Sequence, residues 1–426
     1  MLWEIVSTVF ILTISVWGSP KCRTRFNAEV VCVAGSDDYI LQRGLVSDNN
    51  DTVAITLKDC RITDVDIEAF KNVYNLKEID LSRNKISFLK VGVFDGIPKL
   101  SSLRLSKNLL STLPLGLFDN LPTLQRLDVS DNKINFLKLG IFNNLPQLVR
   151  LELANNEFLG NELDPCLFDK NPMIKYLHFS GNNMSEAPDQ LLNGIQELSI
   201  LGLSNCYLTE IPKFATRSNL NTLKKILLQR NQIRRLDDPT TFINMGNLAM
   251  LDLFNNTIEN LNETVFKPLT KIEVIDLSLN KIEQIPKNMF QNMLSVKSID
   301  LSNNLIKIIP TNAFKSSCLQ TLDLSSNRIS YLERNFFSTL CCFNKTLSTF
   351  YFKNNPFQCA CLVEILKDMK KFGIKHDIDE NKEHTKCSMT NEVTCMRPDE
   401  EIRDVDNDED KLWSTFGLPH YINSTK

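Results

Sequence analysis

The distribution of apolar and polar residues along the chain predicts a series of very short strands. In residues 124–137, LQRLDVSDNKINFL, the apolar Leu127 and Val129 alternate with polar neighbours, which is typical of a strand with one buried face. A strand of about four residues is not stable alone in water. The same pattern stands 24 and 48 residues earlier, as LSSLRLSKNLLSTL and LKEIDLSRNKISFL. We therefore expect each strand to bury its face against the next copy of the pattern.

An asparagine marks one position in nearly every copy of this pattern. It falls at Asn84, Asn108, Asn132, Asn156, Asn182, Asn231, Asn256, Asn280, Asn304, Asn327 and Asn355. Cys60 and Cys206 take its place in two further copies. The pattern L-x-x-L-x-L-x-x-N/C-x-L is identified as the leucine-rich repeat signature, which occurs about thirteen times between residues 52 and 357. The predicted fold class is an α/β solenoid, a leucine-rich repeat horseshoe with a parallel concave β-sheet and disulfide-bonded end caps.

The residues within one repeat are expected to have separate roles. Two apolar strand residues point into the solenoid, and the residues between and beside them point outward, because strand side chains alternate. The asparagine amide can satisfy backbone groups that the following turn would leave buried and unpaired, and Cys60 and Cys206 replace it as small buried thiols. A second column of core residues follows ten positions later: Phe70, Phe94, Phe118, Phe142, Phe266, Phe290, Phe314 and Phe337, with Phe168 and Phe242 slightly displaced. Leu192 and Thr216 interrupt this column, and a local change in curvature is expected there.

The charge of the chain is small overall and uneven locally. A net charge of −3 gives no electrostatic case for binding nucleic acid. Residues 399–410, DEEIRDVDNDED, are strongly acidic, and the tail 398–426 is interpreted as solvated and disordered. Its run of aspartates begins like a calcium loop, but Glu409 stands where the sharp turn needs glycine and Thr415 where a bidentate glutamate should be. The sequence therefore predicts no metal site and no cofactor.

The first eighteen residues resemble a secretory signal. IVSTVFILTISVW is an apolar run, with small residues before a plausible cleavage ahead of Ser19, although Glu4 stands where a positive charge is usual and an ordinary N-terminal helix is the alternative. No other apolar run is long enough to span a membrane. Six N-x-S/T sequons are candidate glycosylation sites: Asn50, Asn183, Asn255, Asn262, Asn344 and Asn423. We expect a secreted, extracellular glycoprotein.

The cysteines cluster near the two ends of the repeats, where caps are needed to cover the terminal core. Cys22 and Cys32 could close a small loop ahead of the first repeat. After the last repeat, NNPFQCACLVEILKDMKKFGIKH includes a segment, 362–372, with apolar residues at helical spacing. Its cysteines, with two more downstream, form either disulfides or a zinc site completed by His376 or His384. Cys318 could pair with Cys341 or Cys342, and Cys166 has no assigned partner.

The pattern N-P-F-x-C-x-C, a helix and two later cysteines resembles the C-terminal flanking cap of animal extracellular leucine-rich repeat proteins, such as Toll ectodomains, Slit and chaoptin-like adhesion proteins. The resemblance implies the pairs Cys359–Cys387 and Cys361–Cys395, and protein or glycan binding on the concave sheet or a flank. Five segments are predicted: a signal peptide, 1–18; an N-terminal cap, 19–51; the solenoid, 52–357; a cysteine-rich C-terminal cap, 358–397; and the acidic tail, 398–426.

Catalytic signatures are missing from the sequence. The four histidines lie outside any G-x-S-x-G, H-E-x-x-H or Cys/His catalytic context, and no glycine-rich phosphate loop occurs. The chain is therefore not expected to be an enzyme, and a hydrolase is the most distant of the alternatives.

The outward strand positions of the sixth to tenth repeats supply a candidate binding face. They include an unusual set of apolar or aromatic residues: Tyr176, His178, Ile200, Leu227, Met250, Phe254, Val274 and Leu279. With strands about 4.8 Å apart, these side chains could form one patch flanked by acidic residues. The alternative is scattered apolar exposure, which is normal on protein surfaces. A glycan on Asn255 would crowd Phe254 and counts against the patch.

The function predicted from the sequence is non-enzymatic binding of an extracellular protein or glycan through the concave face, in adhesion or matrix organisation. The alternative is a soluble innate-immune recognition protein or Toll-like decoy. A homodimer formed through the same sheet is a second use of such a patch.

Overall fold

The computed structural model describes residues 18–25, 28–340, 347–377, 387–388 and 394–397. The chain forms two compact units. Unit 1 holds the described residues up to Phe158 together with Leu167–Met173, and unit 2 holds Leu159–Cys166 and the described residues from Ile174 onward. The predicted signal peptide and acidic tail lie outside the described residues.

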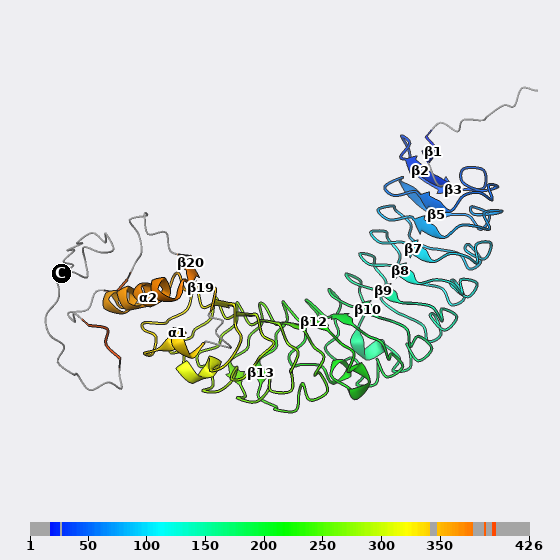
Figure 1. Cartoon of the computed structure of the whole chain (residues 1–426). Helices are drawn as coiled ribbons and strands as arrows, with labels where there is room; N and C mark the ends of the chain where they lie inside the picture. Colours follow the sequence, from blue (N-terminus) through cyan, green and yellow to red (C-terminus); the bar gives the residue numbers. More distant parts are fainter. Residues whose placement is uncertain (1–17, 26–27, 341–346, 378–386, 389–393, 398–426) are drawn as a thin grey trace, which may run out of the picture. The chain divides into compact units, whose positions relative to one another are not determined.

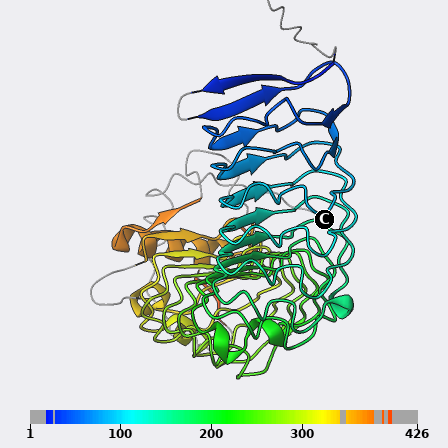
Figure 2. The same cartoon turned by 90° about the vertical axis from the view of Figure 1, so that its right-hand side faces the viewer.

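Unit 1 is a stack of short strands that begins with an antiparallel pair (Figures 1 and 2). Strand β1 (Lys21–Arg25) pairs with β2 (Glu29–Val33), and β2 pairs in parallel with β4 (Ala54–Thr56). The parallel sheet continues through one strand per repeat: β6 (Glu78–Asp80), β7 (Ser102–Arg104), β8 (Arg126–Asp128) and β9 (Arg150–Glu152). A second, two-stranded sheet joins β3 (Tyr39–Leu41) to β5 (Ile62–Val65).

Unit 2 continues the same design with one short parallel strand per repeat (Figure 1). In sheet order these strands are β10 (Tyr176–His178), β11 (Ile200–Gly202), β12 (Lys225–Leu227), β14 (Met250–Asp252), β16 (Val274–Asp276), β17 (Ser298–Asp300), β18 (Thr321–Asp323), β19 (Thr349–Tyr351) and β20 (Lys375–His376). The pair β13 (Arg235–Leu236) and β15 (Asn260–Leu261) forms a small separate sheet. The helices are η1 (Gly160–Glu162), η2 (Lys213–Ala215), η3 (Ser218–Leu220), η4 (Thr311–Phe314), α1 (Phe336–Thr339) and α2 (Cys359–Phe372). Every predicted repeat therefore contributes one strand, and the predicted parallel-sheet solenoid is confirmed.

The asparagine column forms the predicted ladder of side-chain to backbone hydrogen bonds. Nδ2 of Asn132 donates to the carbonyl oxygens of Leu105 and Val129, both at 3.0 Å, and its Oδ1 accepts the N–H of Leu110 at 3.0 Å. One amide thus joins its own turn to the preceding repeat. Cys60 and Cys206 occupy the same column, and each thiol donates to backbone carbonyl oxygens at about 3.5 Å. Burial raises the pKa of Cys60 to about 11 and that of Cys206 to about 12, because it disfavours the thiolate.

The phenylalanine column fills the core behind the sheet, as predicted. Ring centroids of Phe266 and Phe290 are 5.9 Å apart and those of Phe290 and Phe314 are 5.1 Å apart, in both cases nearly parallel. Where Thr216 interrupts the column, η2 places the ring of Phe214 in the core two residues earlier. The helices η2 and η3 mark this repeat as locally irregular, and the change in curvature stays a prediction.

Disulfides secure both ends of the repeats. Cys22 bonds to Cys32 across the β1–β2 pair, and the C-terminal bridges are Cys359–Cys387 and Cys361–Cys395, the pairing that the resemblance implies. These bridges use the thiols that a zinc site would need, so the zinc alternative is wrong. Cys318 is also disulfide-bonded, and its candidate partners Cys341 and Cys342 lie outside the described residues.

The predicted helix at 362–372 is the C-terminal part of α2. It buries its apolar side against the last repeats and ends at Gly373, whose positive φ of 68° closes the helix. No helix in the described part of the chain is long and apolar enough to cross a membrane.

Candidate functional site

The open face of the sheet, defined as the face whose side chains point away from the core, consists of three rows in each unit. The first row holds the first residue of each strand, and the second row holds the third. The third row holds the residue two positions after the strand, because alternation continues past the strand end. Parallel pairing aligns each row across neighbouring strands; for example, Met250 lies beside Val274, and Asp252 lies beside Asp276.

The first row of unit 2 brings together some of the predicted patch and separates the rest. Tyr176 lies beside Ile200, and Met250 lies beside Val274; all four are partly exposed. Lys225 stands between the two pairs, next to both Ile200 and Met250. The expectation of one unbroken apolar patch is therefore wrong at this row, because a basic side chain divides it.

The second row changes character along the unit. It begins with His178, Gly202 and Leu227, and continues with Asp252, Asp276, Asp300 and Asp323. A Cβ atom at Gly202 would lie 2.9 Å from the His178 ring, so glycine leaves space for the imidazole on the neighbouring strand. Leu227 therefore separates His178 and Gly202 from the four aspartates of the row.

The third row holds one aromatic residue, Phe254, between Gln229 and Ser278. Its backbone N–H donates to Oδ1 of Asp252 at 3.1 Å, which ties the main chain of Phe254 to the second row. Leu279, the last predicted patch residue, is 42 % exposed but has a φ of 53°. It lies in the left-handed turn beyond the third row, where alternation along the strand no longer predicts the direction of a side chain.

The aspartates of the second row accept hydrogen bonds from their own turns. Oδ1 of Asp276 accepts the N–H of Ser278 at 2.9 Å, and Oδ1 of Asp323 accepts the N–H of Ser325 at 2.8 Å. The pKa of Asp252 is raised by burial and further by Asp276. Burial likewise raises the pKa of Asp300, with added repulsion from the carboxylates on either side. The smaller, repulsive part of both shifts comes from aspartates on neighbouring strands of the same row.

The open face of unit 1 has the same rows with a different charge balance. Arg104 pairs with Asp80 on the neighbouring strand, with Nη1 and Oδ2 3.8 Å apart. Arg126 reaches Glu78 at 3.2 Å, two strands away, and Arg150 pairs with Glu152 at 2.6 Å. Most acidic side chains on this face therefore have a basic neighbour.

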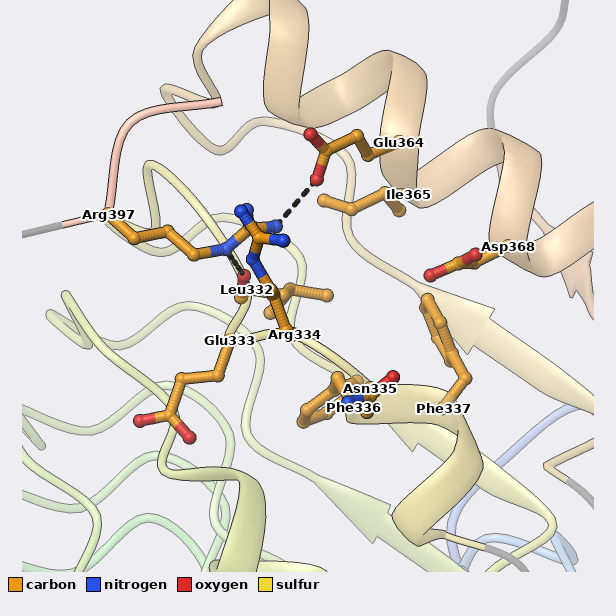
Figure 3. A pocket seen from close by; sticks show the side chains of 10 residues that line it. All are labelled: Leu332, Glu333, Arg334, Asn335, Phe336, Phe337, Glu364, Ile365, Asp368 and Arg397. Carbon is orange, nitrogen blue, oxygen red and sulfur yellow. Dashed lines mark hydrogen bonds and ion pairs between the residues drawn. The ribbon is translucent and has the colours of Figure 1, made fainter. Parts of the chain in front are cut away.

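A separate cavity of about 150 Å³ lies between α2 and residues 332–337 (Figure 3). Arg397, whose side chain is only 10 % exposed, donates to the carbonyl oxygen of Leu332 at 2.9 Å and to Glu364 at 2.7 Å. The guanidinium thus ties the segment after Cys395 to both α2 and the preceding repeat. These contacts give Arg397 a structural role in the C-terminal cap.

The remaining predicted sites have mixed positions. Among the sequons, Asn50 is exposed, Asn183, Asn255 and Asn262 are partly exposed, and Asn344 and Asn423 lie outside the described residues. Glycosylation at all six stays a prediction. Within the described residues, no group of three or more His, Cys, Asp or Glu side chains is arranged to hold a metal ion.

The sequence pattern indicated acidic residues flanking the apolar patch but did not single out the second-row aspartates as part of a binding face. Asp at this position is ordinary in such repeats, and only the pairing of strands shows which carboxylates have a basic neighbour. The available signal was the recurrence of D-L-S or D-L-F in consecutive repeats without an arginine in the adjoining rows.

Comparison with known proteins identifies the family of the repeats. The leucine rich repeat family model matches residues 53–110, 98–158, 196–258, 221–282 and 270–329, together more than half of the chain. Podocan of Mus musculus is 32% identical over 105 residues, which are 24% of this chain and 16% of Podocan. The chain thus matches only a small part of that relative's length.

Two solved structures share the fold at low sequence identity. The Drosophila Toll–Spatzle complex includes a chain that matches with a TM-score of 0.63 and 21% identity, over 87% of this chain and 53% of that one. The LRIM1/APL1C complex matches with a TM-score of 0.60 and 20% identity, over 83% of this chain and 62% of that one. With its ladder, its parallel sheet and its matching repeats, the chain belongs to the leucine-rich repeat family.

Proposed function

We propose that this chain is an extracellular protein-binding module that recognises another protein through the open face of unit 2. The observation that carries the proposal is the partly exposed apolar set Leu227, Met250, Phe254 and Val274 on adjacent strands. Ladder hydrogen bonds fix the backbone beneath these side chains, so binding requires little ordering of the face. Such rigid apolar anchors are typical of binding hot spots.

Two biological roles fit this face. Similarity to part of Podocan favours adhesion or matrix organisation. The second role, soluble immune recognition, draws support from the fold shared with the Toll–Spatzle complex, which is described as a hub in Drosophila development and innate immunity. The disulfides and the predicted signal are consistent with secretion in both cases.

The test is a binding screen of the secreted chain, expressed from Ser19, against extracellular proteins and microbial glycans. The variant Leu227→Glu, Phe254→Glu places charge on the open face. A matched control, Ile243→Glu, Leu294→Glu, changes two apolar residues elsewhere in unit 2 that are 62% and 56% exposed. We expect a protein ligand that binds the control normally and loses at least tenfold in affinity for the face variant. Equal binding by both variants would remove the site from this face.

The glycan predicted at Asn255 provides a second test of the same site. Thr257→Val removes the sequon, and its hydroxyl loses only hydrogen bonds to the carbonyl oxygens of Gln232 and Ile233. If a glycan crowds Phe254, this variant should bind the ligand more tightly than the parent chain. Unchanged affinity would show that the glycan, if present, points away from the binding face.

A further inference from the structure

Part of the open face of unit 2 combines apolar side chains with a continuous acidic row. On β14, β16, β17 and β18 the first row is Met250, Val274, Ser298 and Thr321, the second is Asp252, Asp276, Asp300 and Asp323, and the third is Phe254, Ser278, Ser302 and Ser325. The aspartates are the only charged residues in these three rows. Met250, Val274 and Phe254 border them at the β14 end.

These aspartates have no basic partner among the residues that the structure describes. Their hydrogen bonds go to the turns that follow their own strands, as at Ser302, whose N–H donates to Oδ1 of Asp300 at 2.8 Å. Lys297 directly precedes β17, but its Nζ pairs with Oε2 of Glu273 at 2.7 Å. The half-buried carboxylates therefore have no basic side chain of the described residues paired with them, and a cationic partner would relieve the repulsion among them.

The row also has defined ends. Lys225 stands in the first row of β12, and Lys353 stands in the third row after β19. A basic partner that extended beyond the four aspartates in either direction would meet like charge. The four strands span about 14 Å at a spacing of about 4.8 Å, which corresponds to about ten residues of an α-helix.

The spacing of the carboxylates distinguishes between partner conformations. Lysine or arginine residues three or four positions apart on a helix are about 5–6 Å apart, close to the strand spacing of about 4.8 Å. Side chains on one face of an extended strand are nearly 7 Å apart and would fall out of step with the row after two contacts. At the β14 end, Met250 and Val274 lie on one side of the aspartate row and Phe254 on the other. This suits a helix that carries apolar side chains on both sides of its basic stripe.

We propose that the face formed by β14, β16, β17 and β18 binds an amphipathic, basic helix of a partner protein, lying across the strands. Its lysine or arginine stripe contacts the aspartate row, and its apolar side chains pack on Met250, Val274 and Phe254. This inference deepens the proposed function and rests on it, because it specifies the kind of partner that the open face takes.

The test uses a synthetic peptide of about fifteen residues, with lysines at helical spacing along one stripe and leucines on both sides of that stripe at one end. A matched peptide of equal charge carries two prolines at non-contacting positions, which prevent the helix. Affinity for the full chain is measured by fluorescence anisotropy, and helix formation by circular dichroism. We expect the helical peptide to bind at least tenfold more tightly than the proline peptide and to gain helicity on binding. Its affinity should fall as added salt screens the charges.

Paired variants of the chain locate the binding. Asp276→Asn, Asp300→Asn removes two charges but keeps the side-chain oxygen that accepts from Ser278 and Ser302, so folding is preserved. The control Asp80→Asn, Asp128→Asn makes the same change at the same row of unit 1, where Ser82 and Ser130 donate. We expect at least a tenfold loss of affinity in the first variant and unchanged affinity in the control.

The outcomes separate this inference from the proposed function. Equal binding of the two peptides, no binding of the helical peptide at tens of micromolar, or equal losses in both Asn variants would overturn the basic-helix inference. Any of these results leaves the proposed function intact if the ligand found by screening still loses affinity for the Leu227→Glu, Phe254→Glu variant. If that ligand is insensitive to the face variant while the helical peptide binds the aspartate row, the apolar site is wrong and only the acidic surface remains supported.

Discussion

The open faces of the two units have the same backbone design, but the face of unit 1 is balanced by ion pairs and that of unit 2 carries an acidic row. In unit 1, Arg104, Arg126 and Arg150 pair with acidic side chains of the same face. In unit 2, Asp276 and its neighbours on β14, β17 and β18 accept hydrogen bonds only from their own turns. The repeat therefore dictates where the outward residues lie, and the residue types at those positions decide whether a face is neutralised internally or left to a partner.

The ladder below these faces is nearly identical in the two units, which separates stability from recognition. Asn132 in unit 1 and Asn280 in unit 2 each donate to two carbonyl oxygens at 3.0 Å and accept one backbone N–H at 3.0 Å. A variant at either residue tests whether both units depend equally on this ladder.

The largest predicted effect is the loss of one ladder asparagine. Asn132→Ala and Asn280→Ala each leave one buried backbone N–H, that of Leu110 or Ile258, without its partner, at a cost of about 1–3 kcal/mol. Each also removes one of the two amide hydrogen bonds to each of two carbonyl oxygens, worth about 1 kcal/mol apiece, because the neighbouring ladder asparagines still donate to them. We expect each variant to lose about 4 kcal/mol of unfolding free energy in urea unfolding followed by circular dichroism, with the exposed Asn120→Ala as the control. If one variant lost at least twice as much unfolding free energy as the other, the ladder would not support the two units equally.

The second effect compares the disulfides at the two ends. Cys361–Cys395 closes a loop with a sequence separation of 34, and Cys22–Cys32 one of 10. In the chain-entropy model these bridges stabilise by about 4 and about 3 kcal/mol respectively. We expect the double serine variant of the C-terminal pair to lower the unfolding midpoint more than that of the N-terminal pair. The opposite order would show that local packing outweighs loop length.

The third effect concerns the two thiols of the ladder. Cys60 and Cys206 donate only weak hydrogen bonds of about 3.5 Å, so replacement by alanine should cost about 1 kcal/mol, less than removal of a ladder asparagine. Burial raises the pKa of both thiols, to about 11 and about 12. Both should therefore resist iodoacetamide at pH 8 in the folded chain and react only in denaturant, as measured by mass spectrometry. Rapid modification of the native chain would show that the ladder opens at these repeats.

The regular parts of this fold could be predicted from sequence because the same residue pattern recurs in every repeat. The alternation around Leu127 and the recurring asparagine specify the strand, the ladder and the direction of the core within one repeat. The pairing of the C-terminal cysteines came from resemblance to a family cap, since spacing alone left a zinc site open.

The binding face was less predictable because it depends on neighbours about 25 residues apart. Lys225 divides the first row, which is visible only when β12 is placed between β11 and β14. Leu279 leaves the face because its turn has a positive φ, a conformation that the strand pattern does not reveal. Only the same cross-strand alignment shows that no basic side chain of the described residues pairs with Asp276, and this is where the two units differ most.

The smallest predicted effect is the change in stability when an aspartate of the second row is replaced by asparagine, and it has opposite signs in the two units. Asp300 has a raised pKa in the folded chain, mainly from burial and further from neighbouring carboxylates. A carboxyl that binds its proton more tightly when folded lowers stability once it is ionised, and this loss disappears as the pH falls through the raised pKa and below that of the unfolded chain. Asp300→Asn should therefore raise stability at pH 7 by a few tenths of a kcal/mol, about the scale of partly exposed charges, and have no such benefit in acid.

Asp80→Asn is the matched change in unit 1, because Asp80 also accepts the N–H of its following serine, at 2.9 Å. Its second oxygen lies 3.8 Å from Arg104, so the substitution removes a favourable pair and should lower stability at pH 7 by a similar few tenths of a kcal/mol. Urea unfolding of both variants at pH 7 and at pH 4 measures the two signs. If both variants shift in the same direction at pH 7, the charge balance of the two faces does not differ in the way that their ion pairs indicate, and the acidic row of unit 2 loses its claim to an external cationic partner.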